Sequence, residues 1–495
     1  MKHNAVVLGG SVAGLLAAAA LAPRYDTIEI IERDVLPAGP QARRGAPQGR
    51  HVHAMLPRGL QAIEGLLPGI TERLEAAGGM RGDVLGNARW HLNGRTLRRR
   101  DIGLAAITAS RALIEATIRA AVRELPNVTI TDGHDIVGFA AGRAVRITGR
   151  HGQGSRVVPA TLVVDATGRG SRMPQWLVAL GGAAAPRDEV PIDLRYASRV
   201  FEGDLLGDAL VVVTARYPGQ RRSSVMQRLE GGRVLVTLAG VHGERPPGDP
   251  AGFAAYADTL AVADTAKVIA EGRPVGDAVP FHFPAYVRHR YDQAELPPGV
   301  VVIGDAACAF NPVYGQGMSV AAMSAELLRE DDDPRRFHAG QARLQEAPWT
   351  LAVGADLALD GPPATGPSAG PATGPSTGPA AGPATGPSTG PAAGPATGPS
   401  TGSAAGPATG PSTGSATGSA TGPATGPSTG PTTGPAAGPA AMLRALQLAA
   451  VEDADLAEAF IRVTSLVDPP SALGAPWIAQ RLQARQRPPE EQKTA

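Results

Sequence analysis

Six residues near the N-terminus, Gly9-Gly10-Ser11-Val12-Ala13-Gly14, have the spacing of a dinucleotide-binding turn. They match G-x-G-x-x-G between an apolar segment and an Ala-rich one, with Ser11 in place of the second glycine. Gly9 permits the tight turn, and Gly14 permits close packing of the helix whose N-terminal N–H groups attract a pyrophosphate. Glu32 ends the next predicted strand, where a carboxylate binds ribose hydroxyls and repels a 2′-phosphate. The pattern predicts a site for the adenosine of FAD or NAD, and not of NADP.

A second group of residues, far along the chain, indicates which dinucleotide. The apolar stretch 301–303 reads as a buried strand, and Asp305 follows it with a carboxylate that can accept a hydrogen bond from a ribityl hydroxyl. Pro312 and the turn Gly315-Gln316-Gly317-Met318 then precede a predicted helix. Backbone N–H groups at such a helix start favour the negative charge that a reduced isoalloxazine ring carries. These residues favour a flavin.

With its Gly-Asp pair, proline and Gly-x-Gly, this stretch resembles the second FAD motif of flavin monooxygenases of the aromatic-hydroxylase type. The resemblance implies that Asp165 and Gly168, after the apolar segment 162–164, lie near the FAD pyrophosphate. It also implies that Arg111, at a predicted helix start, contacts an FAD phosphate or the ribityl chain. Residues 45–56 are similar to a segment of squalene-epoxidase-like monooxygenases, which include the flavin epoxidases of polyether-ionophore biosynthesis. The candidate FAD-binding residues are Gly9, Gly10, Ser11, Val12, Ala13, Gly14, Glu32, Arg33, Arg50, Arg111, Asp165, Gly168, Asp305, Pro312, Gly315, Gln316, Gly317 and Met318.

The resemblance implies an FAD-dependent monooxygenase of secondary metabolism, reduced by NADPH or NADH. Through a flavin C4a-hydroperoxide it would insert one oxygen atom of O₂ into a small apolar molecule, by alkene epoxidation or hydroxylation. No catalytic residue is certain; His51 and His53 are candidates for proton transfer or polar residues lining the FAD loop, and no third ligand lies nearby for a metal. Two alternatives stay open: a flavin reductase of the geranylgeranyl-reductase type, and a non-catalytic flavin-binding interaction protein. A halogenase would carry W-x-W-x-I-P, whereas all four tryptophans are isolated.

These residues must be positioned by an α/β fold: a Rossmann-like FAD-binding domain of the glutathione-reductase type, an inserted antiparallel substrate sheet and a helical C-terminal part. Period-two alternation from about Pro191 to Val279 predicts the antiparallel sheet. The predicted boundaries are 1–180 for the first part of the FAD-binding domain (with 60–100 contributing to the substrate side), 181–297 for the substrate domain, 298–360 for the second part, and 442–495 for the C-terminal helices.

The remaining segment, 361–441, is a Gly-Pro-Ala-Thr/Ser array in which glycine recurs at every fourth position from Gly366 to Gly438. Period four excludes collagen, which requires glycine at every third position. With no charged residue, the array has little apolar surface to offset chain entropy, so we expect it to be disordered. It serves either as a flexible loop or as a tether for a partner.

Composition narrows the function classes further. With 46 Lys and Arg against 45 Asp and Glu, the formal net charge is +1, and nothing indicates a nucleic-acid partner. A single cysteine excludes a disulfide framework within the chain. Because no apolar run is long enough to cross a bilayer and no signal peptide is evident, we expect a cytoplasmic protein. Oligomeric state and the choice between NADPH and NADH stay open.

Overall fold

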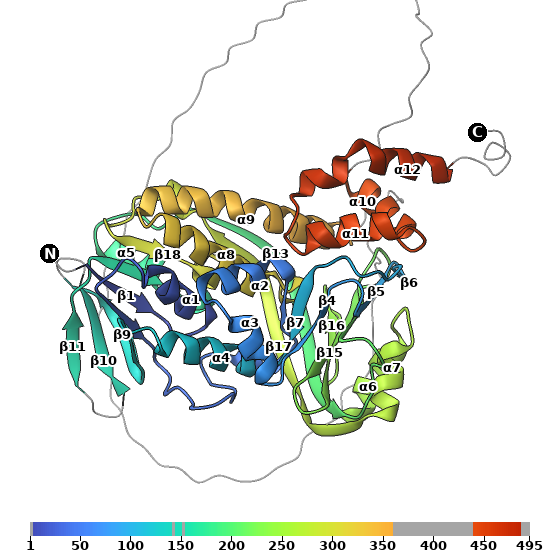
Figure 1. Cartoon of the computed structure of the whole chain (residues 1–495), viewed down its shortest axis with the longest axis horizontal. Coiled ribbons are helices and arrows are strands. Elements are labelled where there is room, and N and C mark those ends of the chain that lie inside the picture. The colour runs from blue at the N-terminus through green and yellow to red at the C-terminus, as the bar shows by residue number, and fades with distance from the viewer. Residues whose placement is uncertain (1–2, 141–143, 151–153, 360–438, 487–495) are drawn as a thin grey trace, which may run out of the picture. The chain divides into compact units, whose positions relative to one another are not determined.

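The predicted FAD-binding domain is built on a five-stranded parallel sheet (Figure 1). The computed structural model describes residues 3–140, 144–150, 154–359 and 439–486. In spatial order the strands are β18 (Val300–Val302), β12 (Leu162–Asp165), β1 (Asn4–Leu8), β2 (Thr27–Ile31) and β8 (Val128–Thr131). Each strand runs parallel to its neighbours. Because both faces of such a sheet are covered, β12 and β18 are almost entirely Val and Leu.

One face of this sheet is covered by helices α1 (Val12–Leu21), α4 (Arg111–Arg123) and α8 (Gln316–Glu330). The small side chains of α1 allow α8 and the sheet to approach it closely, and the helix is buried on almost every side. Helix α2 (Pro57–Leu66) crosses α8 at Gly59, where a Cβ atom would lie 2.3 Å from Ser319 Oγ. Helix α3 (Ile70–Ala76) follows α2 and packs against α4.

The other face is covered by a small antiparallel sheet and by α5 (Met173–Ala179). The strands of the small sheet are β9 (His134–Phe139), β10 (Val145–Gly149) and β11 (Ser155–Val158). Their apolar side chains join those of β1 and β18 in one buried cluster. The parallel sheet therefore lies between a layer of helices and a second layer made of α5 and the small antiparallel sheet.

A second, eight-stranded sheet forms the predicted substrate side. In spatial order its strands are β19 (Cys308–Ala309), β17 (Arg273–His289), β13 (Arg187–Glu202), β16 (Arg233–Gly240), β15 (Arg222–Leu229), β14 (Val211–Thr214), β5 (Ala88–Leu92) and β6 (Arg95–Thr96). Neighbours are antiparallel except β14 and β5. Helices α6 (Pro250–Asp258) and α7 (Asp264–Glu271) bury one face. Strands β13 and β17 extend to Arg187 and His289, beyond the 191–279 segment that alternation alone marks, and β5 and β6 come from the 60–100 segment.

Helix α9 (Pro334–Leu357) packs against α8, and three further helices close the described chain: α10 (Pro439–Ala449), α11 (Ala454–Thr464) and α12 (Pro476–Gln486). Apolar side chains of α10 and α11 pack on those of residues 84–106, which include β5 and β6. Strands β3 (Ala54–Met55), β7 (Ala105–Thr108) and β4 (Met80–Asp83) form a separate three-stranded sheet. The last three residues of the predicted array begin α10; the rest, 361–438, lies outside the described residues.

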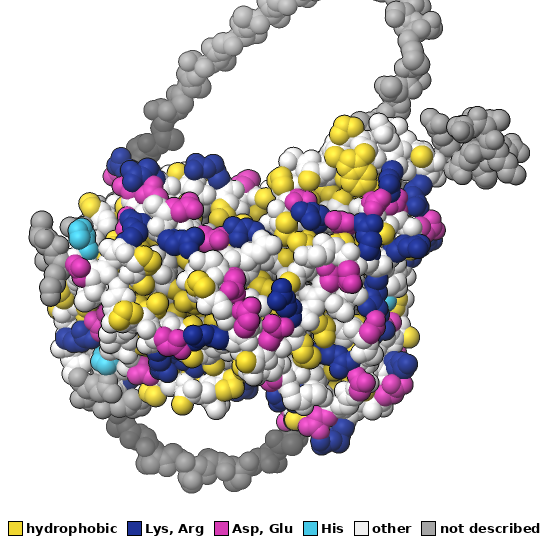
Figure 2. Space-filling view, viewed as in Figure 1, with side chains coloured by type: hydrophobic (Ala, Val, Ile, Leu, Met, Phe, Trp, Pro, Cys, Tyr) yellow, Lys and Arg dark blue, Asp and Glu magenta, His cyan; other side chains and the backbone are white. Residues whose placement is uncertain are grey.

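On the face drawn in Figure 2, basic and acidic side chains are interspersed over the helices and both sheets. No helix in the described part of the chain combines the length and apolarity that a membrane span requires. Within the same residues, no group of three or more His, Cys, Asp or Glu side chains is arranged to hold a metal ion.

Candidate functional site

The three glycine-containing motifs meet at the carboxyl ends of β1, β12 and β18. A Cβ atom on Gly9, after β1, would lie 2.6 Å from the carbonyl oxygen of Ala166, after β12. A Cβ atom on Gly304, after β18, would lie 2.7 Å from Ala13 Cβ on the first turn of α1. Ligands of open α/β sheets bind at this edge. Three segments far apart in the sequence therefore form one site.

The first motif presents the N-terminus of α1 to this site. Gly9 has φ +102°, a backbone conformation that residues with a side chain rarely adopt. A Cβ atom on Gly14 would lie 1.8 Å from the Gly9 carbonyl oxygen. The first helical hydrogen bond is donated by Leu15 N to Ser11 O. The N–H groups of residues 12–14 are therefore left for a ligand, as pyrophosphate binding requires.

Glu32 lies at the end of β2, beside the first motif. Its two carboxylate oxygens accept hydrogen bonds from the backbone N–H of Gly10 (2.7 Å) and of Asp34 (2.9 Å). Its side chain is buried, and Arg43 Nη1 lies 3.2 Å away. Glu32 thus holds the glycine turn through Gly10. It lies where the sequence predicts a residue that binds the ribose.

Arg43 and Glu115 form a buried charge network that the motifs do not contain. Arg43 contacts Asp34 Oδ2 at 3.0 Å and Glu115 Oε1 at 2.7 Å, in addition to Glu32. Glu115 on α4 also accepts a hydrogen bond from Ser11 Oγ at 2.8 Å. Burial raises the pKa of Glu115, but Arg111 and Arg43 outweigh it and hold the pKa below its usual value. The network fixes the loop after β2 against α1 and α4.

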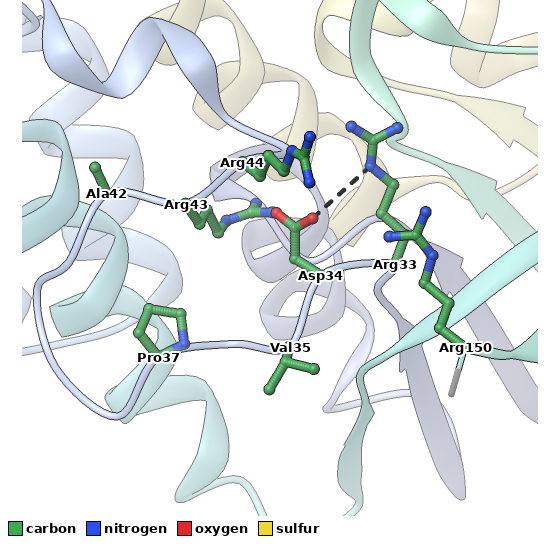
Figure 3. Close-up of a pocket in the computed structure, with 8 residues that line it drawn as sticks. All are labelled: Arg33, Asp34, Val35, Pro37, Ala42, Arg43, Arg44 and Arg150. Carbon is green, nitrogen blue, oxygen red and sulfur yellow. Dashed lines mark hydrogen bonds and ion pairs between the residues drawn. The ribbon is translucent and has the colours of Figure 1, made fainter. Parts of the chain in front are cut away.

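A polar pocket of about 260 Å³ opens beside this network (Figure 3). Figure 3 shows the side chains of Arg33, Arg43 and Arg44 around Asp34, with Arg150 approaching from the end of β10. Arg33 is exposed and lies 4.0 Å from Asp34. Asp34 and Arg43, which line this pocket, both contact Glu32.

Asp305 and the start of α8 form the opposite end of the site. Gly315, with φ +66°, caps α8, and Asp305 Oδ1 lies 3.7 Å from the position of a Cβ on Gly317. Among the described residues, no hydrogen-bond donor reaches the Asp305 carboxylate. Burial raises its pKa, against the opposing charges of Arg169 and Arg111. Gln316 Oε1, nearby and buried, also has no partner in the described chain. Unpaired acceptors beside a helix N-terminus fit a ribityl chain and a flavin ring.

Arg111 lies between the two ends. Its guanidinium donates to Ser11 Oγ at 2.8 Å and approaches Glu115 at 3.4 Å, while its buried Nε has no partner in the described chain. Burial lowers its pKa, and Glu115 and Asp305 oppose that shift. The Nε–H group of Arg111 is therefore a buried donor without an acceptor among the described residues.

The middle motif uses its carboxylate within its own turn. The Asp165 carboxylate is fully buried and accepts hydrogen bonds from Thr167 N, Thr167 Oγ1 and Ser171 Oγ. Its oxygens therefore stabilise their own turn. Gly168, with φ +77° and open space around its Cβ position, is the part of this motif that faces outward.

His51 joins the loop over the site to the substrate sheet. Its Nδ1 lies 2.8 Å from Ser198 Oγ, which lies 2.6 Å from Thr237 Oγ1, and its ring packs edge-on to Tyr196 and Phe281. Burial, aided by Arg50, lowers the pKa of His51 to about 4, so the ring is neutral near pH 7. Its Nε2 is buried and has no partner within the described residues.

His53 points back toward the nucleotide side. Its Nδ1 lies 2.9 Å from the backbone oxygen of His51, and burial, aided by Arg111, lowers its pKa to about 3. Arg50 is exposed. The structure thus gathers most of the predicted site residues around one space, while Arg33 and Arg50 lie at its exposed margin.

Sequence reasoning missed Arg43, Glu115, Arg169, Ser198 and Thr237. The i, i+4 spacing of Arg111 and Glu115 on a predicted helix was the only local signal among them. Arg169 stacks over Phe281, with its guanidinium carbon 5.1 Å from the ring centroid. Such contacts depend on strand pairing and could not be read from spacing.

No family model matches the chain, but two known proteins are similar to it in sequence. Protein Rv3254 of Mycobacterium tuberculosis is 35% identical over 353 residues, which cover 66% of this chain and 72% of that protein. Kynurenine 3-monooxygenase of Salinispora tropica is 25% identical over 363 residues, with the same two coverages of 66% and 72%.

Two solved structures have the same fold. The pqsL protein of Pseudomonas aeruginosa, a probable FAD-dependent monooxygenase, has a TM-score of 0.55 at 15% identity and covers 72% of this chain and 97% of its own. The flavin-dependent brominase Bmp2 has a TM-score of 0.56 at 14% identity, with coverages of 71% and 86%. At these identities the likeness shows the fold alone, and it confirms the predicted fold class. The chain has the α/β fold of these flavin-dependent proteins and belongs to the same family as Protein Rv3254 of Mycobacterium tuberculosis.

Proposed function

We propose that this chain is an FAD-dependent monooxygenase that inserts one oxygen atom of O₂ into a small organic molecule. One observation carries the proposal: the unpaired Asp305 carboxylate faces the N-terminus of α8 at the point where three glycine turns meet. A helix N-terminus and a carboxylate in this arrangement suit a ribityl chain that continues into a ring that accepts negative charge.

FAD, when bound, would supply the electron transfer and the activation of O₂. The chain's own residues bind and orient it. The α1 N-terminus and Arg111 hold the pyrophosphate, Glu32 and the arginine-lined pocket hold the adenosine, and Asp305 holds the ribityl chain. The free N–H groups at the start of α8 stabilise negative charge on the flavin ring.

On the substrate side, Tyr196, Phe281 and Arg169 form an aromatic and cationic wall beside Asp305. The stacked rings of Tyr196 and Phe281 give this wall its apolar surface, whereas Arg169 is exposed to solvent. We propose that bound substrate completes the exclusion of water, which an oxygenase requires to avoid loss of reactive oxygen. His51 Nε2 offers one hydrogen-bonding position to a substrate and, through Ser198 and Thr237, a path for a proton. We therefore favour a largely apolar substrate with at least one polar group, in a reaction of the squalene-epoxidase-like or hydroxylase type.

Oxygen incorporation tests the proposal. The full chain, loaded with FAD, would be supplied with NADPH or NADH under ¹⁸O₂ and with a panel of polyenes, phenols and polyketides. We expect reductant-dependent O₂ consumption and, for at least one compound, a product that carries a single ¹⁸O atom. Asp305→Ala, which removes the ribityl acceptor, is expected to abolish both signals.

Two other results would contradict the proposal, and each would favour a different function. Alkene substrates that gain two hydrogens and no oxygen, equally well under argon, would identify a flavin reductase. Bound FAD with no turnover of any panel member, and no reductant oxidation, would favour a flavin-binding interaction protein. In that case deletion of 361–441 should abolish binding of its partner.

A further inference from the structure

A fully buried carboxylate outside the motifs gathers donors from three parts of the fold. Asp356, on the last turn of α9, is 2% exposed. Its Oδ1 accepts hydrogen bonds from Arg216 Nη2 at 2.6 Å and from Tyr314 Oη at 2.7 Å. Its Oδ2 accepts hydrogen bonds from Tyr286 Oη at 2.5 Å and from Asn311 Nδ2 at 2.7 Å. Four donors on one carboxylate satisfy all of its lone pairs.

Two of these donors belong to the segment between β19 and α8. Asn311 and Tyr314 flank Pro312, and Asn311 Oδ1 also accepts the backbone N–H of Val313 at 3.0 Å. Gly315 and the first N–H groups of α8 follow immediately. Oδ2 of Asp356 thus holds Asn311 at the start of the turn, and Oδ1 holds Tyr314 near its end. This turn leads directly into the α8 N-terminus at the proposed flavin site.

The other two donors belong to the substrate sheet. Arg216 follows β14, and Tyr286 lies in β17, where its ring packs against Trp349 of α9. Arg216 and Asp356 form an ion pair with side chains 3% and 2% exposed. Replacing a buried pair of this kind with apolar residues is often neutral or stabilising, so stability alone gives little reason for it. A positioning role explains why the carboxylate joins these particular elements.

We infer that Asp356 is a positioning residue for the flavin site: it holds the turn 311–315 in register with the substrate sheet and so sets where the α8 N-terminus meets the flavin ring. The inference rests on the proposed function. Asp356 itself touches neither the α8 N–H groups nor Asp305, and acts through Tyr314 and Asn311. Burial, and next the Asp356 charge, raise the pKa of Tyr314, so its hydroxyl stays protonated and remains a donor.

Two tyrosine variants separate positioning from general stability, because Asp356→Asn alone could simply unfold the protein. Tyr314→Phe removes one hydroxyl from the turn side of the carboxylate. Tyr286→Phe removes one hydroxyl from the sheet side of the same carboxylate, and so serves as the matched control. The measurements are the dissociation constant for FAD, from quenching of flavin fluorescence, and the visible spectrum of the bound flavin.

We expect Tyr314→Phe to weaken FAD binding about tenfold and to shift the flavin spectrum, and Tyr286→Phe to leave the dissociation constant within about twofold. Equal effects of both variants on FAD, or an unchanged constant and spectrum in a folded Tyr314→Phe protein, would overturn the inference. If the wild-type chain bound no FAD, the proposed function would fail, and this inference with it. Wild-type binding with indistinguishable variants would overturn the inference alone.

Discussion

Replacement of Arg43 by methionine tests the charge network beneath the proposed adenosine site. The Arg43 side chain is 7% exposed and contacts three carboxylates: Glu32 at 3.2 Å, Asp34 at 3.0 Å and Glu115 at 2.7 Å. Methionine keeps much of the aliphatic volume and removes the charge. The substitution therefore leaves three buried or nearly buried acidic groups facing one another without their shared cation.

The expected loss follows from the donors that remain. Breaking a buried ion pair costs about 3–5 kcal/mol of unfolding free energy. Glu115 keeps Arg111, Glu32 keeps two backbone N–H groups, and Asp34 keeps the backbone N–H of Gly45 at 2.6 Å. Because none of the carboxylates is orphaned, we expect the lower end, about 3 kcal/mol. At about 2 °C per kcal/mol for a large domain, the melting temperature should fall by about 6 °C.

Thermal unfolding of the FAD-free protein at pH 7 and at pH 4.5 measures this loss. The matched control is Arg73→Met, which breaks the exposed pair with Glu124 and should leave the melting temperature almost unchanged. Arg43 is one of the charges that hold the pKa of Glu115 low, so without it Glu115 protonates at higher pH, and the deficit should be largest at pH 7 and shrink toward pH 4.5. A variant as stable as the wild type at pH 7, or a deficit that does not depend on pH, would refute the reasoning.

Three further predictions follow from glycine packing and buried histidines. Gly14→Ala places a Cβ 1.8 Å from the Gly9 oxygen and should weaken FAD binding at least about tenfold, whereas Gly170→Ala meets open space and should bind normally, as a fluorescence titration would show. Burial lowers the pKa of His51 and His338 to about 4, so between pH 6.5 and 4 the unfolded chain binds more protons than the folded one. Urea unfolding should therefore show stability falling with decreasing pH by up to about 3 kcal/mol per histidine. His338→Gln should reduce this dependence, and an unchanged slope would contradict the assignment. Because the His51 ring contacts the substrate sheet, His51→Phe should lower kcat/KM for any substrate identified and leave the FAD affinity within about twofold. An equal loss of FAD affinity would argue against a role of His51 in substrate binding.

The nucleotide side of the fold could be predicted because its signals are local. Gly9, Gly14 and Glu32 each serve a turn, a close helix contact or a strand end that one short segment defines. Asp305 and Gly315 are likewise defined by one short segment, the turns that lead into α8. The convergence of these turns follows from strand order in a parallel sheet, and the structure confirms that fold.

The rest depends on contacts between distant segments. Asp356 meets Arg216 across a separation of 140 residues, and neither residue lies in a recognisable motif. Likewise, Ser198 and Thr237 come together only through the pairing of β13 with β16. Asp165 matched the motif pattern, yet its carboxylate is taken up by Thr167 and Ser171, because a buried acidic group binds the nearest donors.

FAD titration of the purified, FAD-free chain tests the central claim most directly, because every proposed role depends on that cofactor. The wild type should bind one FAD per chain, quench flavin fluorescence at saturation and melt at a higher temperature in its presence. Asp305→Ala should lose most of this affinity. The control Asp204→Ala, whose side chain is 81% exposed on the substrate domain, should match the wild type. A wild-type chain that binds no FAD, or an Asp305→Ala protein that binds it as tightly as the control, would contradict the account.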